Sequence, residues 1–147
     1  MSYRNILVPT DGSPRSRRAI KLAAELAAKF DARLTSIYVV PEGVPTLFSG
    51  AKLYGSGVLS KETRAAIRKA AAEALDTVAR EAERAGVRHS SRRALAHAPW
   101  QAIVRAAHDA DCDLIVMATH GRRGLGVLGS QAVKTVAHSP VPVLVCR

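Results

Sequence analysis

The sequence predicts an α/β protein: one domain, residues 1–147, built as a doubly wound five-stranded parallel sheet with helices on both faces. Short apolar runs alternate with segments of helical periodicity along the chain. The runs are apolar at nearly every position, as expected of strands buried on both faces. Apolar residues make up 48% of the chain and aromatic residues 4%, so the core must be aliphatic.

The first half of the chain contains two predicted strands and one predicted helix. Tyr3–Pro9 is a buried strand that ends in the turn sequence Pro-Thr-Asp-Gly-Ser. Ser13 is predicted as the N-cap of a helix and Pro14 as its first helical residue. Arg33–Val40 is a second strand, rich in β-branched residues, and Pro41–Gly57 is a loop. The apolar face of the helix consists of Ile20, Ala23, Ala24, Ala27 and Phe30.

The second half repeats this alternation. A long helix, Ser60–Arg84, ends at Gly86, and the more polar strand Val87–Leu95 is predicted near a sheet edge. A helix starts at Pro99. The inward positions of the long helix are Ile67, Ala70, Ala74, Leu75 and Val78, and the remaining predicted elements are a central strand Leu114–Ala118, a helix Ser130–His138 and a strand Val141–Cys146.

Composition excludes several classes of protein. No apolar run approaches the roughly 18 residues of a membrane span, and the N-terminal sequence lacks the pattern of a signal peptide. Cys112 and Cys146 have no CxxC spacing, which predicts free thiols in a cytoplasmic protein. The net charge of +10 comes from scattered basic residues without interleaved aromatic residues. Solvated faces therefore explain the charge better than a nucleic-acid surface.

The most informative segment runs from Asp113 to Ser130. An apolar strand leads into a segment with four glycines and two arginines, and a helical pattern follows at once. Glycines allow close approach of a ligand to the backbone, and a helix start offers free N–H groups and a positive dipole end. The segment thus predicts a phosphate site, although a plain surface loop with turn glycines is the alternative. It contains no Walker motif, and its Gly-x-Gly-x-x-Gly match lies too far from the first strand for a dinucleotide fingerprint.

Other candidate sites are weaker. Asp109-Ala-Asp111-Cys-Asp113 resembles the start of a calcium loop, but Leu114 stands where the glycine is needed. A helix-to-strand turn is the favoured interpretation. The five histidines show no metal-ligand spacing, and no nucleophile elbow is present. His120 either contacts a ligand or shapes the turn, and Trp100 is expected to pack rather than to function.

The chain resembles the universal stress protein family over essentially its whole length. The residues that carry the resemblance are Ile6–Ser13, Asp113–Gly124, Gly129-Ser130 and Pro140–Val145. The resemblance implies a five-stranded parallel fold, dimers joined through the last strand in many members, and one branch that binds ATP or AMP through Gly-x2-Gly-x9-Gly-Ser/Thr. A second branch lacks this motif and does not bind nucleotide.

Carried over to this chain, the nucleotide motif matches in part. Gly121 and Gly129-Ser130 match, but Ala118 replaces the first glycine and the spacer between Gly121 and Gly129 has seven residues. The shorter spacer predicts a weaker grip on the outer phosphates. Asp11 is either a ligand contact or only a turn residue. The nucleotide-binding residues that the resemblance implies are Pro9, Thr10, Asp11, Val39, Met117, Ala118, Thr119, His120, Gly121, Arg122, Arg123, Gly124, Gly129, Ser130, Gln131 and Ala132.

These patterns predict a cytoplasmic stress-response protein that binds ATP or AMP and acts as a sensor or regulator. Adenine would lie between the first and second strand ends, and Mg²⁺ would be carried by the phosphates because no protein cage for a metal is visible. The alternative is a stress protein without nucleotide that acts through protein partners. No activating base stands out, so at most slow ATP hydrolysis is expected. A homodimer is expected through Val141–Cys146, which is apolar and predicted at a sheet edge.

Overall fold

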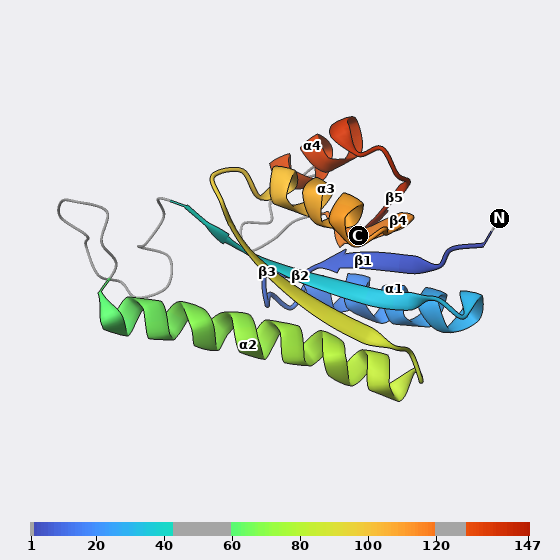
Figure 1. The fold of residues 1–147 in the computed structure, drawn as a ribbon, viewed down its shortest axis with the longest axis horizontal. Helices are drawn as coiled ribbons and strands as arrows, with labels where there is room; N and C mark the ends of the chain where they lie inside the picture. Colours follow the sequence, from blue (N-terminus) through green and yellow to red (C-terminus); the bar gives the residue numbers. More distant parts are fainter. Residues whose placement is uncertain (1, 43–59, 120–128) are drawn as a thin grey trace.

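A computed structural model of the chain describes residues 2–42, 60–119 and 129–147. Its strands form a five-stranded parallel sheet in the order β3-β2-β1-β4-β5. Helices α1 and α2 cover one face and α3 and α4 the other (Figure 1). The predicted α/β class and parallel sheet are confirmed. The elements are β1 Asn5–Pro9, α1 Ser16–Phe30, β2 Arg33–Pro41, α2 Lys61–Arg84, β3 His89–Ala96, α3 Pro99–Asp109, β4 Leu114–Ala118, α4 Ser130–His138 and β5 Val143–Cys146.

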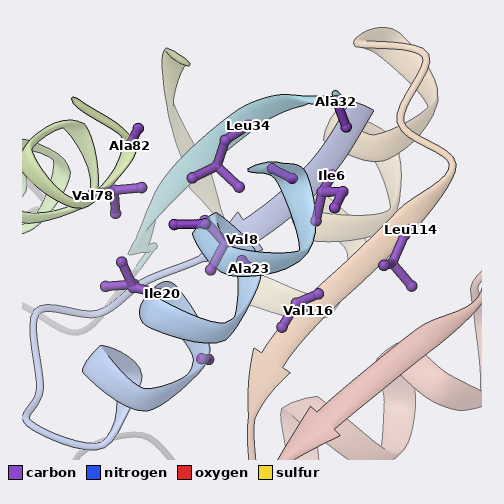
Figure 2. Packing of buried hydrophobic residues seen from close by; sticks show 13 residues of the cluster. Ile6, Val8, Ile20, Ala23, Ala32, Leu34, Val78, Ala82, Leu114 and Val116 are labelled. Carbon is purple, nitrogen blue, oxygen red and sulfur yellow. The ribbon is translucent and has the colours of Figure 1, made fainter. Parts of the chain in front are cut away.

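The core has two layers because side chains alternate across the strands. On the α1 and α2 side, β1, β2 and β4 contribute residues that pack against small residues of α1 and against Val78 and Ala82 of α2 (Figure 2). On the other side, Leu7, Ile37 and Ile115 pack against α3 and α4. Burial of these aliphatic side chains supplies the main stabilisation of the fold. Along α2, the sequence predicted Ala70 as an inward residue, but Ala70 is only half-buried. The next residue, Ala71, is fully buried in its place.

Three helices end in the same way. Asp31, Gly86 and Asp111 each follow a helix with φ of 53°, 68° and 51°. The next residue then donates its N–H back into the last turn, as Ala32 does to the carbonyl of Ala27 at 2.8 Å. The sequence predicted a helix end at Gly86 and a helix-to-strand turn around Asp111, but no helix end at Asp31. Aspartate takes the same left-handed conformation because its short polar side chain tolerates it.

Two predicted boundaries were wrong. Helix α1 begins at Ser16, so Ser13 and Pro14 belong to a preceding turn, in which the Ser16 N–H donates to the Ser13 carbonyl at 3.2 Å. Strand β5 begins at Val143 and not at Val141. The Ser139 hydroxyl donates to the Val141 carbonyl at 2.7 Å and holds Val141 in a turn, while Pro142 has no N–H for the ladder. The remaining strand and helix predictions agree with the structure to within about two residues.

The order of the strands places β1 and β4 side by side at the centre. From β1 the chain winds outward through β2 to β3, and it then returns to build β4 and β5 on the other side. Strands β3 and β5 are therefore the edges, as predicted for both. Within the described residues, no helix is both long and apolar enough to cross a membrane.

Candidate functional site

The carboxyl ends of β1 and β4 form the switch point of the sheet. The connections that follow these two strands diverge, because one leads to β2 and the other to β5 on the opposite side. Ligands of open parallel sheets bind beyond the strand ends at such a point. Most of the residues predicted from the sequence to bind nucleotide follow β1 and β4 or begin α4.

Strand β1 stops short of its neighbour β2. Pro9 pairs with Ile37, whereas β2 continues to Pro41 beside β3. The Thr10 N–H donates to the Ile37 carbonyl at 3.0 Å, so the main-chain groups of Ile37 face β1. In a strand, alternate residues direct their main-chain groups to the same side. The N–H and carbonyl of Val39 are therefore directed toward the space beyond the end of β1.

The turn after β1 is held by its own side chains. The Thr10 hydroxyl accepts a hydrogen bond from the Gly12 N–H at 3.1 Å, and the Asp11 carboxylate accepts one from the Ser13 N–H at 2.8 Å. Gly12 has φ of 78°, and a Cβ there would lie 3.4 Å from Ala74 of α2. The role of Asp11 as a turn residue is thus observed, and its contact with a ligand stays a prediction.

A pair of serines supports this turn: Ser13, which the sequence had predicted as a helix N-cap, and Ser16, which it had not indicated. Ser16 is buried, accepts a hydrogen bond from the Thr10 hydroxyl at 3.2 Å, and donates to the Ser13 carbonyl at 2.7 Å. The available signal was the spacing of Thr10, Ser13 and Ser16, three residues apart, directly before the apolar face of α1. Buried hydroxyls need partners, and here they find them in one another and in the main chain of Ser13 and Ser16.

The end of β4 is bonded directly to the start of α4. The Gly129 N–H donates to the Thr119 carbonyl at 2.7 Å, and the Thr119 N–H donates to the Cys146 carbonyl of β5 at 2.9 Å. We call these two bonds the β4–α4 clasp. The predicted ligand residues between its ends, namely His120, Gly121, Arg122, Arg123 and Gly124, lie outside the described residues.

Helix α4 begins at this clasp. Its N-cap is Gly129, with φ of −59° and ψ of 150°, and a glycine has no side chain to accept a hydrogen bond from the first turn. The amides of Ser130, Gln131 and Ala132 belong to this first turn, where helices present unsatisfied N–H groups and a positive dipole end. Ala132 is buried and offers only its main chain.

The side chain of Gln131 contacts α3. Its Oε1 accepts a hydrogen bond from the Trp100 N–H at 3.0 Å and so supports the start of α3. The Trp100 ring stacks on His138 at the other end of α4, with ring centroids 4.5 Å apart. Trp100 therefore joins α3 to both ends of α4, which agrees with the predicted packing role.

Four predicted residues lie within strands, and three of them, Val39, Met117 and Ala118, divide between the two faces of the sheet. Met117 and Val39 pack into the cluster on the α3 and α4 side. Ala118 packs against the α1-side cluster together with Cys146. The methyl group that replaces the family's first glycine therefore points away from the face that carries Met117 and Val39.

The acidic sequence before β4 has a structural role. Asp111 ends α3, and the Asp113 carboxylate accepts the N–H groups of Arg4 and Asn5 at 2.9–3.2 Å. The helix-to-strand turn expected there is confirmed.

No group of three or more His, Cys, Asp or Glu side chains that could hold a metal occurs in residues 2–42, 60–119 and 129–147. Burial raises the pKa of the Cys112 thiol to about 11 and lowers the pKa of His89.

Comparison with known proteins is consistent across sequence and structure. The model of the universal stress protein family matches residues 2–147. A universal stress protein of Methanocaldococcus jannaschii is 37% identical over 147 residues, covering 99% of this chain and 82% of the relative. A universal stress protein structure from Lactobacillus plantarum superposes with a TM-score of 0.79 at 25% identity, over 100% of this chain and 99% of the other. A universal stress protein in complex with cAMP superposes with a TM-score of 0.70 at 25% identity, over 100% and 98% of the two chains.

Proposed function

Because this chain belongs to the universal stress protein family, we propose that it binds an adenine nucleotide at the switch point and acts as a sensor or regulator. The observation that carries the proposal is the start of α4, which follows β4 at that point and whose N-cap, Gly129, has no side chain to satisfy the first N–H groups. A helix start of this kind is a ready anion site, and a phosphate satisfies its N–H groups. The related structure with bound cAMP supports an adenine ligand.

The base would lie beside β2. The main-chain groups of Val39 face the space beyond β1, and an adenine edge offers both a hydrogen-bond donor and acceptors. The turn Pro9, Thr10 and Asp11 would border the base and ribose. This turn is held in place by bonds to Gly12, Ser13 and Ser16, so little ordering would be needed on binding.

The phosphates would lie at the start of α4. Gly129, Ser130 and the amides of Gln131 and Ala132 would bind the α-phosphate, with Gly121–Gly124 and the adjacent arginines completing the site. Met117, Ala118, Thr119 and His120 would line the approach from β4. Mg²⁺ would travel with the nucleotide and neutralise phosphate charge, since it keeps several waters and needs few protein ligands.

The direct test is a thermal-shift measurement with ATP, AMP and GTP on the full chain. A ligand that binds only the folded state raises the melting temperature by mass action. We expect ATP and AMP to raise it and GTP to raise it less. Mass spectrometry of natively purified protein adds an independent measurement, because a bound adenine nucleotide would copurify. If no adenine nucleotide shifts the transition and none copurifies, the proposal is wrong.

A second function, in the branch of the family that binds no nucleotide, is favoured by two sequence features. The spacer between Gly121 and Gly129 has seven residues, and Ala118 replaces a glycine. On this alternative the protein would act through a protein partner. ATP turnover beyond slow hydrolysis is not part of either proposal. A cytoplasmic location stays a prediction from the free thiols.

We also propose a homodimer formed through the last strand. Strand β5 is an edge strand of apolar residues, with Leu144 39% exposed. The adjacent helix α4 exposes Val133 and Val136. An apolar edge of this kind invites pairing with another chain, and antiparallel pairing with a second copy would cover it.

A further inference from the structure

A groove of about 500 Å³ lies between β3 and α3, away from the switch point. The described residues that line it come from β2, β3 and α3, and none of them belongs to the proposed nucleotide site. Helix α3, which lines the groove, lies on the face of the sheet opposite α2 (Figure 1). Its volume falls within the usual range for small-molecule sites.

The groove exists because small side chains face each other across it. Ala94 of β3 and Ala102 and Ala106 of α3 present only methyl groups. Ile37 of β2, which is buried, also lines the groove. Methyl groups at facing positions cannot fill the space that larger side chains occupy elsewhere between a helix and a sheet. The inner wall of the groove is therefore apolar.

The rim of the groove is cationic. Arg92 lies two residues before Ala94 on β3, so its side chain shares the face toward α3. Arg105 lines the groove from α3. Its only ion pair among the described residues is with Asp109, at 3.7 Å and with the Arg105 side chain 83% exposed. An exposed pair of this length contributes little, and Arg92 forms no ion pair with any described residue.

We propose that this groove binds a small organic acid with one carboxylate and a short apolar tail. The carboxylate lies between Arg92 and Arg105, where planar guanidinium groups offer paired N–H donors. The tail lies against Ile37, Ala94 and Ala106 and removes their apolar surface from water. The lining holds three arginines, Arg92, Arg93 and Arg105, against the single aspartate Asp109, and this excess of positive charge suits an anion. This site is independent of the nucleotide proposal, because it shares no residue with it.

The test is a titration of the full ¹⁵N-labelled chain with hexanoate, followed by amide shifts at constant ionic strength. We expect saturable shifts at Ala94, Ala102 and Ala106 that saturating AMP does not abolish. Arg92→Gln and Arg105→Gln should each weaken binding about tenfold, the usual effect of losing a charge-assisted hydrogen bond. Arg68→Gln, which removes an exposed arginine from α2, should leave it unchanged.

Two further arms keep the outcome clear. Ala102→Leu keeps both arginines but fills the groove, and it should block hexanoate while the amide spectrum still shows a folded protein. Hexanol and inorganic phosphate are the matched probes for the tail alone and the charge alone. Equal binding of hexanol or of phosphate, displacement of hexanoate by AMP, or no saturable shift with hexanoate would each overturn the proposal.

Discussion

The two edges of the sheet, on either side of β1, differ in the side chains that they expose. On one side, β2 leads to the edge strand β3, whose exposed residues include Arg92 and Arg93. On the other, β4 leads to β5, which is short and entirely apolar. A charged edge resists pairing with another chain, whereas an exposed apolar edge favours it. The exposure of one apolar residue is therefore a poorer indicator of a pairing edge than the residues around it. Leu95 on the charged strand β3 is 62% exposed, whereas Leu144 on the apolar strand β5 is only 39% exposed.

The largest effect should come from placing a charge on the apolar edge. Leu144→Asp is expected to convert the dimer to a monomer, because a carboxylate cannot be buried there without a partner. Light scattering should fall from about twice 15.6 kDa to that value. Leu95→Asp on the other edge is the matched control and should leave the mass unchanged.

A second result bears on the same edge. Removal of residues 141–147 should give insoluble protein, because the deletion also takes Val143, Val145 and Cys146 from the two core clusters. Wild-type protein that is monomeric at tens of micromolar would contradict the dimer, whatever the variants do.

The next effect concerns the β4 flank, which is proposed to hold the phosphates. Gly129→Asp places bulk and negative charge beside the first turn of α4, and we expect it to abolish binding of both ATP and AMP. Ser130→Ala should weaken both only modestly, since main-chain amides remain. Calorimetric titration of each variant with magnesium present measures the change. Normal binding by Gly129→Asp would place the phosphates elsewhere, and circular dichroism controls for loss of fold.

A smaller difference should separate the two nucleotides. The spacer between Gly121 and Gly129 has seven residues, which removes main-chain N–H groups that would face the β- and γ-phosphates. Exposed arginines compensate little because solvent and salt screen them. We therefore expect ATP and AMP affinities to differ by less than about tenfold, or ~1.4 kcal/mol. A hundredfold preference for ATP in the same calorimetry would refute this role of the spacer.

The smallest effect is a difference between the two sides of the sheet in how pH changes the free energy of unfolding. Burial raises the pKa of Cys112, just before β4, from 9.0 to about 11, so its contribution to stability is lost as pH rises through that interval. Burial lowers the pKa of His89 on β3 below 6.5, so its contribution is lost as pH falls below that value. Urea unfolding across pH should show Cys112→Ala flattening only the alkaline limb and His89→Gln only the acid limb. If the curves of stability against pH were identical in wild type and variants, neither Cys112 nor His89 would be the group responsible.

The elements set by a strong local pattern could be predicted from the sequence. Leu114–Ala118 and Ser130–His138 have the predicted bounds, because each combines a clear apolar period with a glycine or proline signal nearby. The missed boundaries depend on hydrogen bonds that no period encodes, such as the Ser13 turn and the Ser139 turn. Asp31 was not identified as a helix end because aspartate takes the left-handed conformation far less often than glycine.

The candidate site was predictable only in part. The order of the strands follows from general rules of parallel sheets, so the residues after β1 and β4 could be grouped in advance. The early end of β1 beside a longer β2, which directs the main chain of Val39, depends on the register and not on residue types. The direction of the Ala118 side chain, toward the α1 side of the sheet, likewise follows from the alternation of side chains along β4. The groove between β3 and α3 arises from alanines on separate elements, a coincidence that a single sequence does not reveal.

The β4–α4 clasp has a consequence for how this protein can vary. The Gly129 N–H donates directly to the Thr119 carbonyl, so the two ends of the intervening segment are held next to each other. Residues added or removed there need not shift β4 or α4, and each doubling of such a length costs only about 0.6 kcal/mol in closure entropy. The length of this segment can thus change by insertion and deletion alone, which makes the position suitable for grafting segments from relatives without redesigning the sheet.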